Sequence, residues 1–171
     1  MDSAGQFLEK GDLVEFKSNS GTYSHWGIYD GSGHVIHVIG DDDDVRQVTS
    51  SPSILPARES LSAAVGKVDA YVRRARLQDV VSGRKFYKNN MLDTSHPPLP
   101  VEEILKQAML YVGEQWDYNL LSSNCEHFVS MMRYGLAISL QVVDAGRLVQ
   151  KVAAAGAVGT TALLGSLRVS R

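Results

Sequence analysis

The chain has 171 residues, of which 44% are hydrophobic and 21% charged, and its formal net charge at pH 7 is −2. These values are typical of one globular domain and exclude an intrinsically disordered chain, and the small net charge gives no electrostatic basis for binding nucleic acid. The single cysteine excludes an intramolecular disulfide and a multi-thiolate zinc site, and no apolar secretory signal is visible, so a reducing, cytoplasmic location is expected.

Apolar and polar residues alternate in several short stretches of the first half, which predicts strands. A glycine-rich turn at residues 31–33 joins two of them into a hairpin. The polar and basic stretch at 74–97 predicts irregular structure. The predicted strands are 13–16, 26–29, 34–39, 45–48 and 67–73, with an acidic loop at 41–44 and a loop at 50–66 that has room for a short helix.

The second half predicts helices. Several prolines precede residues 101–113, where apolar residues at helical spacing follow two acidic residues, so a helix is expected there. Asn124 is a good N-cap for a second helix that contains Cys125 in its first turn and ends near Gly135. A last helix should cover part of 138–165. Strands followed by helices indicate an α+β fold, with an antiparallel sheet packed against helices.

Cys125 is the candidate nucleophile. The first turn of a helix offers free N–H groups and the positive end of the dipole, and both favour thiolate over thiol. A thiol nucleophile also needs a base, and the base needs a third group that orients it. A buried, inert thiol is the competing interpretation.

His25 and His37 are the candidate base and orienting group. They lie on the two strands of the predicted hairpin, so we expect their imidazoles to face each other, with Cβ atoms about 5 Å apart. Two other histidines fit less well. His34 has the opposite strand parity to His37, and His127 lies about 200° around the helix from Cys125, so a capping or packing role is expected for His127.

A zinc site is another interpretation of Cys125, His25 and His37. Two histidines and one cysteine could hold zinc with an open position, and only the placement of the cysteine at a helix start favours the thiol triad. The acidic run at 41–44 lacks the glycine and the distal glutamate of a calcium-binding EF-hand loop. The residues alone leave the zinc site and the thiol triad both open, and the thiol mechanism requires neither a metal nor an organic cofactor.

Two blocks of the sequence are similar to a known superfamily. The resemblance covers about residues 8–136 and is to the lecithin:retinol acyltransferase-like superfamily, most closely its phospholipase A and acyltransferase group, also called the H-Ras-like suppressor family. The matching segments are Gly11–Glu15, His25–Tyr29, Gly31–His37, Pro97–Ile104, Tyr118–Leu120, Asn124–Val129 and Arg133–Gly135.

The resemblance implies a papain-like fold of the NlpC type in permuted order. It implies that Cys125 is the nucleophile, His25 the general base and His37 the polarising third member. Relatives of this kind remove an acyl chain from a glycerophospholipid through a thioester on the cysteine. Water as acceptor gives phospholipase A1/A2 activity, whereas lysophospholipid or phosphatidylethanolamine gives O- or N-acyl transfer. The expected partners are these lipids and a membrane surface.

One departure from the family pattern concerns access of the substrate. Family members commonly have Ala-Pro soon after the second histidine, where this chain has Ile39-Gly40 and the acidic run. This difference affects acyl preference rather than the triad. Three other functions stay open: retinol-type O-acyl transfer, a cell-wall-like amide peptidase, and a non-enzymatic membrane-associated interaction protein with the same fold.

The C-terminal part predicts a separate tail. We expect a catalytic domain at 1–136 and a helical tail at 137–171. Within the tail, 152–167 carries no charge and has basic residues on both sides, but it is rich in alanine and glycine and shorter than the roughly 20 residues of a spanning helix. A flexible tail and a membrane anchor both fit. The resemblance favours a single-pass anchor and hence membrane association.

Overall fold

The computed structural model describes residues 1–18, 23–40, 68–119, 124–140 and 143–144. The chain divides into two compact units, Met1–Ile138 and Ser139–Arg171. The first unit contains the sheet, the helices and the candidate site. In the second, the described residues Leu140, Val143 and Asp144 are helical.

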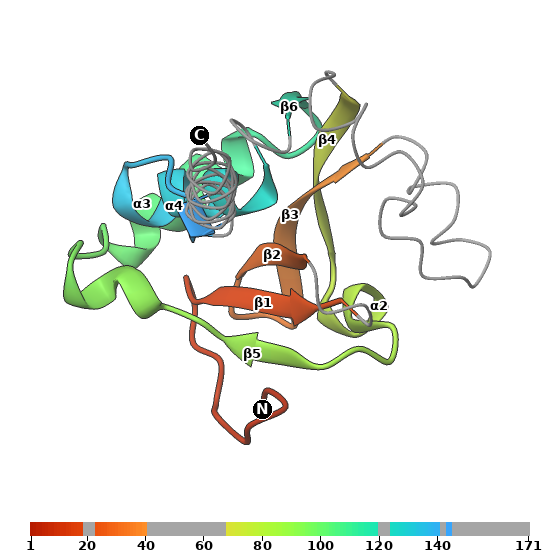
Figure 1. Cartoon of the computed structure of the whole chain (residues 1–171), viewed down its shortest axis with the longest axis vertical. Helices are drawn as coiled ribbons and strands as arrows, with labels where there is room; N and C mark the ends of the chain where they lie inside the picture. The colour runs from red at the N-terminus through yellow and green to blue at the C-terminus, as the bar shows by residue number, and fades with distance from the viewer. Residues whose placement is uncertain (19–22, 41–67, 120–123, 141–142, 145–171) are drawn as a thin grey trace, which may run out of the picture. The chain divides into compact units, whose positions relative to one another are not determined.

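An antiparallel sheet of six strands forms the centre of the first unit (Figure 1). Its spatial order is β5-β1-β2-β3-β4-β6, and each pair of neighbours runs antiparallel. Strands β2 and β3 are the two arms of the hairpin. The strands are β1 (Leu13–Lys17), β2 (Ser24–Tyr29), β3 (His34–Gly40), β4 (Val68–Arg76), β5 (Phe86–Lys88) and β6 (Gln115–Tyr118).

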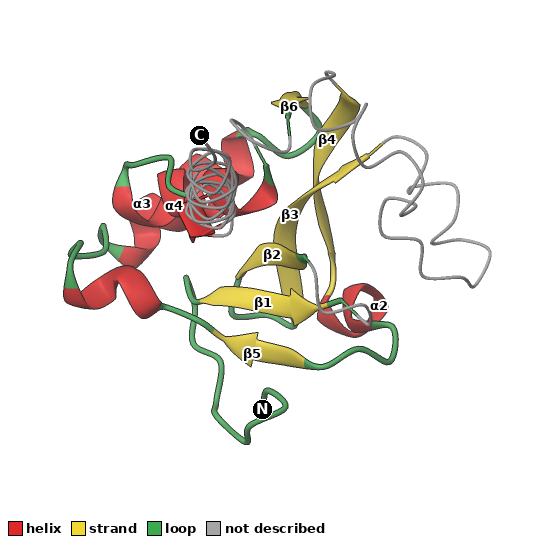
Figure 2. Cartoon of the chain, viewed as in Figure 1, coloured by secondary structure: helices red, strands yellow, loops and turns green. Residues whose placement is uncertain are grey.

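The helices lie on both sides of this sheet (Figure 2). Helices α3 (Val101–Leu110) and α4 (Cys125–Tyr134) pack against each other, and α4 lies on β2 and β3. The short helix α2 (Leu77–Val81) packs against β3 and β4, and a 3-10 turn, η1 (Met91–Thr94), follows β5. Among the described residues, no helix is both long and apolar enough to cross a bilayer.

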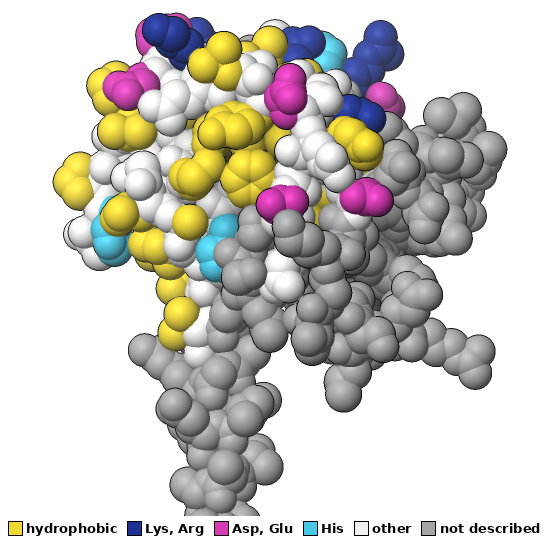
Figure 3. Space-filling view, turned by 90° about the horizontal axis from the view of Figure 1, so that it is seen from above, with side chains coloured by type: hydrophobic (Ala, Val, Ile, Leu, Met, Phe, Trp, Pro, Cys, Tyr) yellow, Lys and Arg dark blue, Asp and Glu magenta, His cyan; other side chains and the backbone are white. Residues whose placement is uncertain are grey.

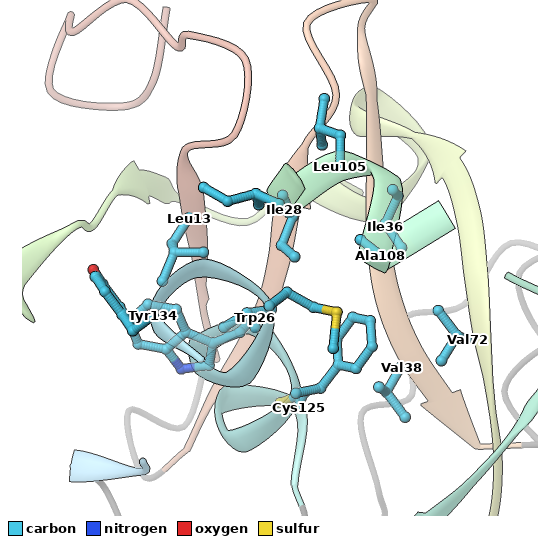
Figure 4. Packing of buried hydrophobic residues seen from close by; sticks show 14 of the residues in the cluster. Leu13, Trp26, Ile28, Ile36, Val38, Val72, Leu105, Ala108, Cys125 and Tyr134 are labelled. Atoms are coloured by element: carbon cyan, nitrogen blue, oxygen red, sulfur yellow. The ribbon is translucent and has the colours of Figure 1, made fainter. Parts of the chain in front are cut away.

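Two hydrophobic clusters cover the two faces of the sheet. The larger cluster joins α3 and α4 to the sheet through residues such as Trp26 and Ile28, and it includes Cys125 (Figure 4). The smaller cluster contains Val14 and Phe16 together with Val35 and Val80. Successive residues of a strand point to opposite faces, and four consecutive residues of β1 are buried, so β1 is covered on both faces. On the face that α4 covers, tight packing holds the helix in place against the sheet.

Most of the predicted elements are confirmed. The strands at 13–16, 26–29, 34–39 and 67–73 form, and so do the helices after Pro100 and Asn124. The α+β class with an antiparallel sheet is also confirmed. The predictions for 41–44, 45–48, 50–66 and 152–167 lie outside the described residues.

The prediction of irregular structure at 74–97 is wrong. This stretch holds the end of β4, then α2, β5 and η1. These elements are only three to five residues long beyond β4, so none shows a full period of alternation in the sequence. They form because β5 pairs with β1 and because α2 covers the smaller cluster.

Candidate active site

The two hairpin histidines meet on adjacent strands. His25 Nε2 lies 2.9 Å from His37 Nδ1, and the rings are edge-on with centroids 5.1 Å apart. The expectation that the imidazoles face each other is confirmed. The register pairs His37 with Gly27, so His25 is the diagonal neighbour of His37 rather than its direct partner. A Cβ at Gly27 would lie 3.4 Å from the His37 Cβ, so the glycine allows β2 and β3 to approach closely here.

Burial keeps the His25 imidazole neutral. The pKa of His25 is lowered well below its usual value, chiefly because burial penalises the charged ring and further because His37 and Arg84 repel a positive charge. The ring packs beside Phe16, with centroids 5.7 Å apart. Since Nε2 is bound to His37, Nδ1 of His25 is the nitrogen left to accept a proton, and it makes no hydrogen bond to any described residue.

Helix α4 places Cys125 at its first position. The Asn124 side chain accepts a hydrogen bond from the His127 N–H at 3.0 Å, and His127 Nδ1 accepts one from the Asn124 N–H at 3.2 Å. This reciprocal pair is a capping box, so the predicted capping role of His127 is confirmed. Gly135, in the left-handed region at φ 71°, ends the helix as expected.

The thiol of Cys125 lies beside the start of β2. Its sulfur is 3.4 Å from Tyr23 Oη and 3.9 Å from the carbonyl oxygen of Ser24, the residue before His25. Cys125 is only 1% exposed. The backbone N–H groups of Trp26 and Glu126 also face the sulfur, so the structure brings Cys125 to the strand that carries His25.

The thiol is protonated in this environment. Burial raises the pKa of Cys125 to about 11, against the lowering effect of a hydrogen bond from Tyr23 and of the Trp26 backbone. The Glu126 N–H at the helix start lowers the pKa of the thiol, as expected, but burial outweighs this effect. A helix dipole contributes about 0.3–1 kcal/mol, whereas complete burial of a charge costs several times more.

Tyr23 and Tyr118 are polar residues of the site that the sequence reasoning did not assign. Tyr118 Oη lies 3.2 Å from Tyr23 Oη, so two hydroxyl groups lead to the sulfur. Tyr23 precedes β2 and Tyr118 ends β6, which the sequence did not predict as a strand. Two signals were available: Tyr23 stands two residues before His25, and Tyr118 begins one of the segments that match the family.

The described residues contain no group of three histidine, cysteine or acidic side chains placed to hold a metal ion. The two imidazoles of the predicted zinc ligands are bonded to each other instead of converging with the thiol. A thiol, a neutral imidazole and a second imidazole that orients the first are the components of nucleophilic acyl transfer.

Comparison with known proteins gives the family. The model of the family described as Lecithin retinol acyltransferase matches residues 6–138. The chain belongs to this family. Human "Phospholipase A and acyltransferase 1" is 38% identical over 156 residues, which cover 91% of this chain and 83% of the relative. Human "Phospholipase A and acyltransferase 4" is 39% identical over 146 residues, covering 85% and 81%, and human "Phospholipase A and acyltransferase 2" is 38% identical over 157 residues, covering 92% and 88%.

Proposed function

We propose that this protein is a thiol-dependent phospholipase A1/A2 and acyltransferase that acts on glycerophospholipids. Family membership and the names of the relatives support this function. The observation that carries the proposal is the buried thiol of Cys125 at the capped start of α4, beside the strand that bears the His25–His37 pair. The chain order, with the histidines before the cysteine, supports the permuted papain-like form of the fold.

In the proposed mechanism, His25 is the base and Cys125 the nucleophile. His25 Nδ1 takes the thiol proton as the sulfur attacks an ester carbonyl of the lipid, while His37 holds Nε2 and fixes the ring. The N–H of Cys125, at the first position of α4, has no acceptor within the helix and can stabilise the oxyanion. His25 then protonates the departing lysophospholipid, and a thioester remains on Cys125.

A second acceptor completes the cycle. Water attacks the thioester and gives hydrolysis, whereas the amine of phosphatidylethanolamine or the hydroxyl of a lysophospholipid gives acyl transfer. In either case His25 takes the proton of the acceptor and returns it to the sulfur. The thiol proton, which the resting Cys125 directs to the Ser24 carbonyl, has to turn toward His25 for this transfer, while the sulfur keeps its contact with Tyr23.

An apolar surface near α4 supports action at a membrane. Met109, Leu110 and Tyr111 at the end of α3 are all more than a third exposed. Tyr111 also packs against Trp116 and Phe128, one helical turn after Cys125. Figure 3 shows hydrophobic side chains gathered near the centre of one face. Exposed aliphatic and amphipathic aromatic side chains suit the boundary between headgroups and acyl chains, so this surface can hold the enzyme on lipid.

Replacing Cys125 with alanine tests the nucleophile. The variant should release acyl chains from phosphatidylcholine at least a thousandfold more slowly than the wild type. Mass spectrometry of the wild-type protein after brief incubation with this lipid should show an acyl adduct on Cys125. His25→Gln should lose activity to a similar extent. His34→Gln, at a half-buried hairpin histidine that does not contact the site, is the matched control and should keep it. Full activity in Cys125→Ala would rule the assignment out, and inhibition by a chelator would favour zinc.

Retinol-type O-acyl transfer is the second candidate, and the family description supports it. Competition between retinol and phosphatidylethanolamine for the acyl group on wild-type enzyme separates the two. Preferential formation of N-acyl phosphatidylethanolamine supports the proposal, and preferential formation of retinyl ester supports the alternative.

A further inference from the structure

A half-buried tyrosine, Tyr23, and a buried one, Tyr118, lead to the catalytic sulfur from outside the cysteine-histidine set. Tyr23 Oη has Cys125 Sγ at 3.4 Å on one side and Tyr118 Oη at 3.2 Å on the other. The three residues come from the segment before β2, from β6 and from the start of α4. Three separate parts of the fold therefore converge to place one hydroxyl group against the thiol.

The direction of these hydrogen bonds follows from the number of protons. The thiol has one proton, and in the part of the chain that the structure describes it can donate this proton to the Tyr23 oxygen or to the carbonyl of Ser24, which can only accept. When the S–H donates to Ser24, the Tyr23 hydroxyl is free to donate to the sulfur, and Tyr118 can donate to Tyr23. Once the sulfur loses its proton, the Ser24 carbonyl no longer binds it, whereas the Tyr23 hydrogen bond becomes charge-assisted and stronger.

We propose that Tyr23 is a further catalytic residue, whose hydroxyl stabilises the Cys125 thiolate as it forms, with Tyr118 as the positioning residue that orients this hydroxyl. The catalytic role of Tyr23 rests on the proposed function, whereas its stabilisation of the Cys125 thiolate does not. The interaction is stronger with the thiolate than with the thiol, so it lowers the barrier to attack. It also offsets part of the burial that disfavours a charged sulfur in this site.

The surroundings leave Tyr23 as the donor. Burial, together with the neighbouring Cys125 and Tyr118, raises the pKa of Tyr23 far above its usual value, so its hydroxyl keeps its proton when the sulfur loses one. Glu126 of α4 is the acidic group near the thiol, and its negative charge disfavours the thiolate. Tyr23 is thus the side-chain donor that counters both the burial and Glu126.

The test is the titration of Cys125 in Tyr23→Phe, in the full-length protein. The chain has one cysteine, so ¹³Cβ-labelled cysteine gives a single NMR signal that reports the state of the sulfur. Loss of the donor should move the midpoint upward by about one pH unit, in line with the ordinary strength of a charge-assisted hydrogen bond. The rate of iodoacetamide alkylation should then fall about tenfold at each pH between 7 and 9.

Two further variants make the result specific. Tyr118→Phe should shift the midpoint in the same direction by less, since Tyr23 still donates. Tyr134→Phe loses a hydrogen bond of comparable length, 2.8 Å to Asp93, away from the sulfur, and should leave the midpoint unchanged. If Tyr23→Phe does not fold, the Tyr118→Phe variant decides: an upward shift of the Cys125 midpoint supports the proposal, and an unchanged or lowered midpoint overturns it.

An unchanged or lowered midpoint in Tyr23→Phe would overturn the proposal, since a tyrosine that only packs, or that accepts from the thiol, has that effect. The shift is measured without lipid, so it can be present in a protein that releases no acyl chain. That combination would contradict the proposed function while leaving the role of Tyr23 in place.

Discussion

At the scale of single residues, burial sets the protonation states of the two reacting groups. It raises the pKa of Cys125 and lowers the pKa of His25, so the resting site holds a neutral thiol and a neutral imidazole. A preformed thiolate–imidazolium pair would need two buried charges. Proton transfer is therefore expected to accompany the attack on the lipid rather than to precede it.

The pH dependence of acyl release follows from the state of His25. The base must be neutral, and its pKa lies well below the usual 6.5, so kcat/KM should stay level as the pH falls through 6.5 and decline only further down. The measurement is kcat/KM with a short-chain soluble phospholipid between pH 4.5 and 8. An acid limb centred at pH 6.5 or above would contradict it, and His34→Gln should leave the limb in place.

The sequence predicts the residues of the site better than their contacts. The hairpin turn allows the His25–His37 encounter to be predicted, because strand geometry fixes it locally. Tyr23 and Tyr118 stand 95 residues apart, and only the pairing of β6 with β4 brings the second one to the site. The level of burial around Cys125 is likewise a property of the whole core, which no local pattern reports.

At the scale of elements, the capping box fixes the start of α4 and with it the position of the sulfur. Asn124→Ala should lower the free energy of unfolding by about 1 kcal/mol, the ordinary cost of a lost N-cap, and His127→Ala should cost a similar amount. The two changes share one motif, so the double variant should lose less than the sum. Urea denaturation checks this, and strict additivity would contradict a reciprocal cap.

The elements that the sequence missed share a physical cause. β6 has four residues and β5 has three, and each is stable only through its partner strand, β4 or β1. Short segments of this kind bury too little surface to show in their own residue pattern. The longer strands β1 to β4 and the helices α3 and α4 carry enough alternation or helical spacing to be predicted directly.

At the scale of the whole molecule, one buried cation joins the start of the sheet to α4. Arg133 is 6% exposed, donates two hydrogen bonds to the Asp93 carboxylate and a third to the carbonyl oxygen of Gly11. Tyr134 donates to the same carboxylate. Segments far apart in the sequence are thereby held to the helix that carries Cys125.

The end of the first unit can be located by the hydrogen bonds that it needs. Ser130 Oγ of α4 donates to the Ile138 carbonyl oxygen at 2.8 Å and accepts a hydrogen bond of 2.8 Å from the Ile138 N–H, so residues up to 138 help to hold the helix that carries Cys125.

We therefore expect the fragment 1–138 to fold and to release acyl chains from soluble short-chain phospholipid. The fragment 1–136, which ends at the boundary predicted from sequence, should be less stable by about 1–3 kcal/mol, because two hydrogen bonds are lost at the buried Ser130. Thermal and urea unfolding of the two fragments, with Ser130→Ala in 1–138 as the matched control, measure this difference. Equal stability of the two fragments would show that 137–138 contribute nothing, and failure of 1–138 to fold would show that the catalytic unit needs residues beyond Ile138.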